Sequence, residues 1–355
     1  MSGEYLHHPN PSRAPVISGA QKPACGRDEL SAARGWAGRV LEAGRWLSAL
    51  LGRDFGGASG RRDGRPRPEP ADPPPEGALR VMTFNVRGSY HRDGENAWRR
   101  RAALNVRAIA RQGPDLIGFQ EFQDGNARVY ERELAGYEHA LGHRYENRPP
   151  HAYNAVYWDG GRLEALAAGS FWLSETPDRF SGSWETRQIR SANWVRFRPV
   201  SGAPEFVYVN THLDHVSGRA RVEGSALILE WLDGPVADGA PVLLTGDFNC
   251  EPSSKARSVF SDAGFVDAHL VAGHAPAKTF HAFRGEGFRG RDPSKEHRID
   301  WILLRDGSRG ERWEVEGYSI ARDAEPPLYP SDHYPVIADL SLRDAGSAPD
   351  DVTRI

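Results

Sequence analysis

Short apolar runs of strand length lie in adjacent groups along this sequence, and this grouping constrains the fold more than any other feature. Four of them follow one another between residues 152 and 213 without an intervening helical pattern. The expected strands cover residues 79–86, 115–122, 152–158, 170–174, 192–199, 205–213, 241–249, 298–304 and 334–340, and the expected helices cover 96–111, 126–134, 220–232 and 253–260. Grouped strands favour a two-sheet α+β sandwich over a doubly wound sheet.

The chain divides by composition into an extension, one folded domain and a tail. Residues 1–77 form the expected extension, which ends in a Gly/Arg/Pro-rich linker at 56–77. Within it, residues 31–53 predict a basic amphipathic helix, which either caps the domain, is dispensable, or touches an anionic membrane surface. The first two readings are favoured because the segment is short and isolated. The expected domain covers 78–342, and a flexible tail covers 343–355.

Charge and cysteine content exclude several classes of protein. The 355-residue chain has a formal net charge of −3, and residues 78–355 hold 39 acidic and 34 basic residues, so a strongly basic nucleic-acid footprint is missing. The two cysteines, Cys25 and Cys250, build neither a disulfide framework nor a zinc site. The N-terminus lacks the pattern of a signal peptide, and no run of about 18 apolar residues predicts a membrane span. We therefore expect a cytoplasmic protein that acts as a monomer.

Polar side chains mark the ends of many of the expected strands. In LLTGDFNCEP (243–252), an apolar run ends by presenting Asp247 and Asn249, which alternation along a strand places on the same face. The full set comprises Asn85, Glu121, Asn210, His212, Asp214, His215, Asp247, Asn249, Asp300, Asp332 and His333. Burying such groups costs free energy unless they are paired or liganded. We therefore expect one shared site to satisfy them.

The chemistry of this set indicates a reaction at phosphorus. Carboxylates with amide and imidazole groups, and no thiolate, suit a hard divalent cation such as Mg²⁺ or Mn²⁺. Hydrolysis of phosphate esters needs rate gains of about 10¹⁷ or more, whereas one general base supplies only about 10²–10⁴. The remainder must come from positioning and from charge stabilisation by a cation and hydrogen-bond donors.

The polar motifs together resemble the endonuclease/exonuclease/phosphatase superfamily, which includes DNase I-like and exonuclease III-like nucleases, deadenylases, sphingomyelinases and inositol phosphatases. The motifs are FNV around Asn85, QE at Glu121, TH at His212, GDFN at 246–249, ID at Asp300 and SDH at 331–333. The resemblance covers about residues 79–341. It implies a four-layer α/β/β/α sandwich of two packed mixed sheets flanked by helices. It also implies hydrolysis of phosphoester bonds by in-line attack of an activated water, with Mg²⁺ or Mn²⁺ as cofactor.

A finer resemblance is to a bacterial branch of this superfamily that carries a phrase like FWLSETPD, present here at 171–178. That branch continues with a Trp-acidic pair, an Arg, and HLDH with a downstream Arg, matched here by Trp184, Glu185, Arg190, residues 212–215 and Arg221. The sequence departs from the branch before one expected strand, where His151, Tyr153 and Asn154 replace the usual Gly and acidic residue. This departure concerns substrate recognition rather than metal chemistry.

The resemblance assigns metal and water chemistry to five residues. Glu121 is the principal expected metal ligand, Asn85 lies close to metal and phosphate, and Asp332 contributes to metal or water. Asp247 would orient or deprotonate the attacking water. Asn249 would hold that water or donate to a phosphate oxygen.

The remaining roles concern the phosphate and the rest of the substrate. His333 would contact the phosphate, with its other ring nitrogen held by Asp300. His212 would donate to a non-bridging oxygen. The expected substrate-binding residues are Arg190, Asn154, Asp214 and His215. For Asp214 and His215, shaping the leaving-group side and a structural role remain equally open.

The leading hypothesis is a divalent-metal-dependent phosphodiesterase or phosphatase that acts on a phosphorylated small molecule, a nucleotide or a short nucleic acid. A nuclease on duplex DNA is less favoured because the folded part is net acidic, whereas duplex binding relies on many Lys and Arg contacts. A non-catalytic phospho-ligand binding protein should have lost Glu121, Asp247 or His333, and all three are present. A lipid phosphodiesterase recruited by residues 31–53 is the remaining alternative.

Overall fold

The computed structural model of the chain describes residues 71–143, 152–290, 292, 294–344 and 346. The helix expected at 31–53, most of the 56–77 linker and most of the 343–355 tail lie outside these residues, so these expectations stay predictions. Among the described helices, none combines the length and the apolar character that a membrane crossing requires.

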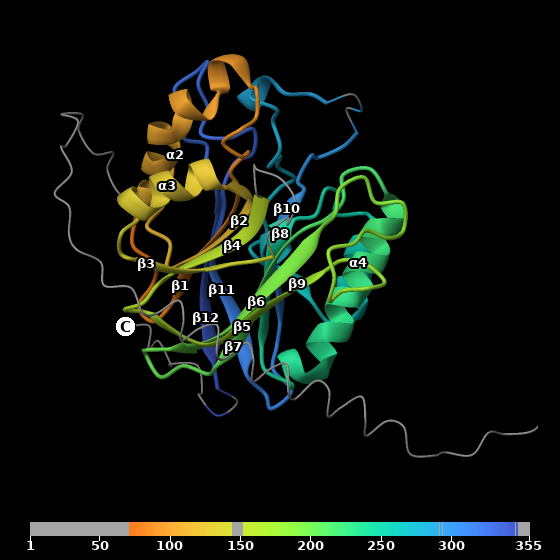
Figure 1. The fold of residues 1–355 in the computed structure, drawn as a ribbon. Coiled ribbons are helices and arrows are strands. Elements are labelled where there is room, and N and C mark those ends of the chain that lie inside the picture. Colours follow the sequence, from red (N-terminus) through yellow and green to blue (C-terminus); the bar gives the residue numbers. More distant parts are fainter. Residues whose placement is uncertain (1–70, 144–151, 291, 293, 345, 347–355) are drawn as a thin grey trace, which may run out of the picture. The chain divides into compact units, whose positions relative to one another are not determined.

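Two six-stranded mixed sheets form the centre of the fold (Figure 1). The first has the order β11-β12-β1-β2-β4-β3, with β11 at Arg312–Ile320, β12 at Val336–Arg343, β1 at Leu79–Asn85, β2 at Leu116–Gln123, β4 at Ala152–Asp159 and β3 at Tyr137–Leu141. The second has the order β5-β6-β7-β8-β10-β9, with β5 at Leu163–Trp172, β6 at Ser191–Pro199, β7 at Phe206–His212, β8 at Val242–Asp247, β10 at Asp300–Arg305 and β9 at Val266–Asp267. In each sheet one central pair, β1–β2 or β7–β8, is parallel.

Helices cover the outer face of each sheet, which makes four layers. Helices α2 (Trp98–Gln112) and α3 (Asp124–Glu133) pack on the first sheet, and α4 (Gly218–Trp231) and α5 (Lys255–Asp262) pack on the second (Figure 1). The short helix α6 is Ala268–Val271; single turns lie at Gly94–Asn96 (η1) and Gly285–Gly287 (η3), and a π-helical turn at Leu232–Val236 (η2). The predicted α/β/β/α sandwich is therefore confirmed.

Each interface between layers has its own apolar core. Every residue of the central strands β1 and β7 is buried. Both faces of these strands are therefore covered, which explains apolar residues such as Val81 and Val207. Between the sheets, one cluster joins Val336 to Tyr208 and Leu243. Because both faces of the central strands are covered, a polar group can reach solvent only at a strand end.

A polar bridge between the sheets accounts for Asn210, which the sequence grouped with the site. Its side chain is fully buried and donates to the carbonyl oxygens of Phe119 (2.9 Å) and Ala155 (3.1 Å) on the opposite sheet. Gln120 Nε2 in turn donates to Asn210 Oδ1 over 2.7 Å. Asn210 therefore ties the two sheets together instead of facing the cleft.

Several strands escaped prediction from the sequence. β3, β9 and β11 have no counterpart among the expected strands, and β5 begins at Leu163 rather than at 170. The reason is visible in their burial: β3 and β11 are edge strands in which every residue is exposed or half-buried, so neither is an apolar run. The other expected strands and the four expected helices are present, with ends shifted by a few residues.

A buried arginine fastens the loops at one end of the first sheet. Arg101 of α2 is fully buried, and its guanidinium donates to the carbonyl oxygens of Val86 (2.9 Å), Asn96 (2.8 Å) and Pro330 (2.8 Å), and also to that of Arg87. Burial lowers the pKa of Arg101 to about 10, so the side chain still carries its charge at neutral pH. Val86 and Arg87 directly follow Asn85, and Pro330 lies two residues before Asp332. Arg101 therefore holds the segment that carries Asn85 at a fixed distance from the segment that carries Asp332.

We predict that Arg101→Met lowers the free energy of unfolding by about 3 kcal/mol, because several buried carbonyls lose a charged donor. Urea denaturation of the two proteins measures this difference. The matched control is Arg100→Met on the same helix, because Arg100 is exposed and pairs on the surface with Glu95, and it should change stability by less than about 0.5 kcal/mol. Equal midpoints for the two variants would contradict the role given to Arg101.

Candidate active site

The register of the second sheet brings three predicted residues side by side. His212 is the last residue of β7 and pairs with Asp247, the last residue of β8, which pairs in turn with Asp300, the first residue of β10. Since β10 runs antiparallel to β8, its beginning lies at the same edge of the sheet where β8 ends. All three side chains are almost completely buried. Strand register alone therefore gathers an imidazole and two carboxylates at one edge.

A backbone irregularity delivers Glu121 to the same place. The pairing of β2 with β4 shifts register between Phe119 and Phe122, and Glu121, inside this bulge, has a φ of 53°. Bulges and left-handed non-glycine residues cost conformational free energy and are concentrated where a side chain must be redirected to a functional site. Asn249 and Arg87 share this feature, with φ values of 50° and 49°. Three segments of the site are thus held in backbone conformations that ordinary strands avoid.

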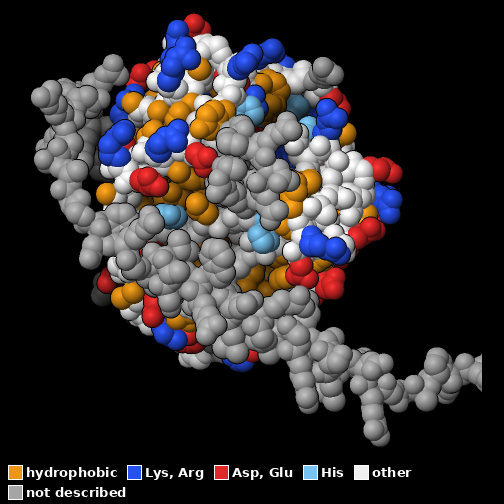
Figure 2. All heavy atoms as spheres, viewed as in Figure 1, with side chains coloured by type: hydrophobic (Ala, Val, Ile, Leu, Met, Phe, Trp, Pro, Cys, Tyr) orange, Lys and Arg blue, Asp and Glu red, His pale blue; other side chains and the backbone are white. Residues whose placement is uncertain are grey.

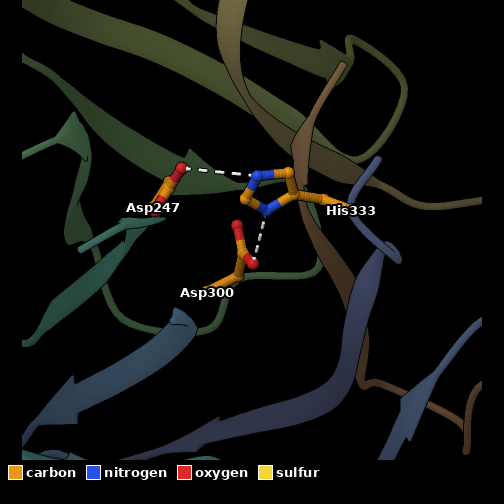
Figure 3. A group of neighbouring side chains, drawn as sticks. All are labelled: Asp247, Asp300 and His333. Carbon is orange, nitrogen blue, oxygen red and sulfur yellow. Dashed lines mark hydrogen bonds and ion pairs between the residues drawn. The ribbon is translucent and has the colours of Figure 1, made fainter. Parts of the chain in front are cut away.

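The imidazole of His333 lies between two carboxylates (Figure 3). Its Nδ1 is 2.9 Å from Asp300 Oδ2, and its Nε2 is 3.8 Å from Asp247 Oδ2. Burial would lower the pKa of His333, but the charges of Asp300 and Asp247 outweigh it and raise that pKa to about 10. Burial and the charge of Asp300 raise the pKa of Asp247 to about 7, although His333 opposes this. The group therefore holds a cationic imidazole beside a carboxylate that can accept a proton near neutral pH.

The tautomer of His212 follows from its neighbours. Arg190 Nη1 lies 3.0 Å from His212 Nδ1, and a guanidinium can only donate, so Nδ1 is the acceptor. The proton then sits on Nε2, which is 3.3 Å from Asp247 Oδ2. Burial, followed by the charge of Arg190, lowers the pKa of His212 well below its usual range. His212 is therefore a neutral donor, unlike His333.

Asn249 completes this side of the site. Its backbone N–H donates to Asp247 Oδ1 over 2.9 Å, which fixes the carboxylate. Its Nδ2 donates to the carbonyl oxygen of Leu213 over 3.0 Å and lies 2.9 Å from His212 Nε2. The neighbouring chain segments thus hold the carboxylate, amide and imidazole groups together.

On the opposite side, Asn85 links the two sheets at the level of the site. Its Nδ2 donates to Asp247 Oδ2 (2.9 Å) and to Glu121 Oε1 (3.2 Å), while its Oδ1 accepts from the backbone N–H of Arg87 (3.0 Å). The amide therefore faces both carboxylates with its nitrogen. Metal ligation through the oxygen of Asn85 would require the amide to turn over, and that role stays a prediction.

Asp332 lies almost buried beside Glu121 at the cleft. Its Oδ2 is 3.7 Å from Arg87 Nε, and the guanidinium of Arg87 is also paired with Asp93. Burial raises the pKa of Asp332, and the charge of Glu121 adds to this effect. Burial also opposes ionisation of Glu121, but its contact with His91 and the charge of Arg87 help to bring the pKa of Glu121 well below the usual value. Glu121 is therefore held as an anion, whereas burial favours the protonated form of Asp332.

These side chains surround a cleft of about 470 Å³. The residues that line it are Arg87, His91, Glu121, Gln123, Asn154, Gln188, Arg190, Ser191, His212, His215, Asp247, Asn249, Phe280, Ile299, Asp332 and His333. Most of the predicted catalytic and metal residues are in this set. Asp300 and Asn85 lie behind it and contact it through His333, Asp247 and Glu121.

Three of the four predicted substrate-binding residues line the cleft, and the fourth does not. Arg190, His215 and Asn154 are in the lining, although Asn154 also donates to the carbonyl oxygen of Ser191 over 2.7 Å. Asp214 is buried, and its carboxylate accepts four backbone N–H groups, from Arg187, Gln188, Val216 and Ser217. Burial raises its pKa, but these hydrogen bonds lower it to about 2. The structure thus places Asp214 as an anchor for the loop that carries Gln188 and Arg190.

Several lining residues were absent from the sequence prediction: Arg87, His91, Gln123, Gln188, Ser191, Phe280 and Ile299. Arg87, Gln123 and Ile299 lie within two residues of a predicted polar strand end, so position beside a strand end was a usable signal. His91 and Phe280 lie in loops, and nothing in their local sequence pattern marked them.

The donor set fits a hard divalent cation at Glu121 better than one at His333. Asp247, Asp300 and His333 place ligand atoms within 4.8 Å of one another. However, the ring of His333 fills the space between the two carboxylates, and a shared cation would break its hydrogen bond to Asp300. Glu121 Oε2 is buried and lies 3.0 Å from His91 Nε2, and Asp332 lies near it. A buried carboxylate oxygen that faces the cleft with a second carboxylate beside it suits Mg²⁺ or Mn²⁺.

Two packed mixed sheets with an acidic, imidazole-rich cleft at one edge define the class of DNase I-like sandwich proteins. The chain belongs to the Endonuclease/Exonuclease/phosphatase family, whose sequence model matches residues 82–333. Members of this family are hydrolases that act on phosphoester bonds, and they generally use divalent metal ions. No curated protein matches the sequence closely enough to count as a relative.

Solved structures agree with this assignment. The endonuclease/exonuclease/phosphatase from Bacteroides vulgatus is 27% identical with a TM-score of 0.66, and the match covers 75% of this chain and 99% of that one. A mannosyl-6-phosphatase from Bacteroides thetaiotaomicron is 26% identical with a TM-score of 0.65, over 74% and 99% of the two chains. TDP2 from D. rerio, complexed with a single strand DNA product, is 15% identical with a TM-score of 0.59, over 75% and 100%, and shows the fold alone.

We predict that Arg190→Ala raises the pKa of His212, because protonation no longer brings a second positive charge against the guanidinium. Nitrogen-15 NMR of the metal-free protein across a pH titration measures this pKa and the position of the proton. The exposed neighbour Arg187 provides the control, and Arg187→Ala should leave the titration of His212 unchanged. A wild-type His212 that carries its neutral proton on Nδ1 would contradict the hydrogen-bond assignment.

Proposed function

We propose that this protein is a divalent-metal-dependent hydrolase of phosphoester bonds that works by in-line attack of an activated water. The observation that carries the proposal is the convergence of Asp247, His212 and the His333–Asp300 pair on one cleft that also contains Glu121. A base, a neutral donor, a cationic donor and an acidic cation site are the components that hydrolysis of a phosphate ester requires.

Glu121 and Asp332 would hold the cation, with Asn85 beside them. When bound, a divalent cation supplies charge stabilisation at the phosphoryl oxygens and lowers the pKa of a coordinated water. The chain itself fixes the carboxylate of Glu121, because the bulge at Glu121 and the hydrogen bond from Asn85 leave it little freedom.

The roles of the other residues follow from their protonation. Asp247, with a pKa raised to about 7, is matched to accept a proton from the attacking water at neutral pH. His333 is cationic and donates to a phosphate oxygen through Nε2, while Asp300 holds its other nitrogen. His212, with its proton on Nε2, donates to a second oxygen, and the backbone N–H of Asn249 fixes the carboxylate of Asp247.

The proposed substrate is a phosphorylated small molecule, a nucleotide or a short nucleic acid. A cleft of about 470 Å³ has the size of a small-molecule site. The mannosyl-6-phosphatase among the similar structures supports a sugar phosphate as the first compound to test.

Basic side chains visible on the surface argue against duplex nucleic acid as the main substrate. Figure 2 shows basic side chains scattered over the part of the surface formed by α2 and α3. On α2, Arg100, Arg107 and Arg111 are each paired with a carboxylate. Duplex binding depends on basic side chains that are available to phosphates. A nuclease that acts on single strands remains the alternative, as does a protein that only binds phosphorylated ligands.

One screen separates these functions. The purified protein is assayed with Mg²⁺ and with Mn²⁺ against sugar phosphates, nucleotides, model phosphodiesters, and single- and double-stranded DNA and RNA. Metal-dependent release of phosphate from a small monoester supports the proposal. Binding of all these compounds without turnover of any would leave only the non-catalytic alternative.

We predict a graded loss of activity on the best substrate of that screen. Asp247→Ala and His333→Ala should each lower kcat by several orders of magnitude, since each removes a group that acts at the reacting phosphate. Asn249→Ala should lower kcat by about 10²–10³, the scale of one lost donor. The exposed Asp262 on α5 gives the control variant, Asp262→Ala, which should keep wild-type kcat. A folded Asp247→Ala protein with nearly normal turnover would refute the role of Asp247.

A further inference from the structure

The loop between β1 and α2 places a histidine against the predicted metal ligand. His91 Nε2 lies 3.0 Å from Glu121 Oε2, and both residues line the cleft. That oxygen is buried, and the His91 imidazole forms an ion pair with it when it is protonated. The side chain of His91 is 35% exposed, which leaves its ring open to the cleft.

The loop that carries His91 is fixed at several points. The backbone N–H of Tyr90 donates to Gln123 Oε1 (2.9 Å), and that of Ser89 donates to Asn126 Oδ1 (3.1 Å). Gln123 and Asn126 also form the capping box at the start of α3, directly after the strand that carries Glu121. His91 and Glu121 are therefore anchored to the same structural element, so their proximity is built into the fold.

The distance between the two atoms matches adjacent ligands on one cation. In an octahedral site with bonds of about 2.1 Å, neighbouring ligand atoms lie about 3.0 Å apart. His91 Nε2 and Glu121 Oε2 have this separation. We propose that His91 is a ligand of the divalent cation held by Glu121, and that its nitrogen makes this site prefer Mn²⁺ to Mg²⁺. The inference rests on the proposed function, because it presumes that a divalent cation binds at Glu121.

The preference follows from the chemistry of imidazole. Mg²⁺ is bound almost entirely by oxygen ligands. Mn²⁺ also favours oxygen ligands, but as a first-row transition metal it accepts an imidazole nitrogen more readily than Mg²⁺ does. A site built only from oxygen ligands would not favour Mn²⁺ over Mg²⁺ for this reason. One imidazole next to Glu121 and Asp332 therefore shifts the balance toward Mn²⁺.

Other histidines of the cleft are less suited to this role. His333 has Nδ1 bonded to Asp300 and Nε2 directed at Asp247, and His212 lies between Arg190 and Asn249. His215 has no carboxylate within 4.0 Å among the described residues. His91 thus combines an open ring with direct contact to the principal predicted ligand.

The test measures the metal rather than turnover. Full-length protein is loaded with Mn²⁺, and pulsed electron paramagnetic resonance detects coupling between the ion and nitrogen-14 of a bound imidazole. We expect this coupling in the wild type and its loss in both His91→Gln and His91→Ala. Calorimetry with Mn²⁺ and with Mg²⁺ alone should show that these variants bind Mn²⁺ at least about 10-fold more weakly, whereas the affinity for Mg²⁺ changes by less than about 3-fold.

His215→Ala is the matched control, since it removes an imidazole from the same cleft and should leave both affinities and the nitrogen coupling unchanged. Bound Mn²⁺ without nitrogen coupling, or coupling that survives both His91 variants, overturns the role of His91 but leaves the proposed function standing. Failure of the wild-type protein to bind either ion overturns both. Circular dichroism of each variant confirms that a loss of binding does not reflect unfolding.

Discussion

The site depends on one electrostatic constraint, which is that Asp247 and Asp300 are buried side by side on neighbouring strands. Two such carboxylates repel each other unless a cation lies between them or one takes up a proton. His333 supplies that cation, with Asp300 on one ring nitrogen and Asp247 facing the other. The two carboxylates raise the pKa of His333, whereas burial and the charge of Asp300 raise the pKa of Asp247, so the group contains an acid beside a base.

Three residues of the site have strained backbone conformations. Left-handed backbone at Glu121, Asn249 and Arg87 costs about 1–3 kcal/mol each and persists only where the surroundings enforce it. The surroundings here are the two covered sheets, the bridge made by Asn210 and the carbonyl clamp of Arg101. Rigid packing on both sides of the cleft thus maintains conformations that an isolated strand end would lose.

The sequence was sufficient to predict those site residues that lie at the ends of apolar strands. Asp247 and His212 were predictable because a covered strand can expose a polar group only at its end, and strand register then aligns such ends. Asn210 was misplaced, because a polar residue near the end of an apolar run can equally bridge two sheets. The proximity of His91 to Glu121 was not predictable, since it depends on the path of a loop and on hydrogen bonds between residues more than 30 positions apart. β11 was missed because an edge strand with a charged face has no apolar run.

The most direct test of this account is a crystal structure of the protein soaked with Mn²⁺, in which anomalous scattering locates the ion. We expect a peak against the carboxylate of Glu121, with the hydrogen bond between His333 and Asp300 intact beside it. A peak between Asp247 and Asp300, with the His333 ring displaced, would show that those two carboxylates are balanced by a metal instead of by an imidazole. That result would contradict the arrangement from which every assigned role follows.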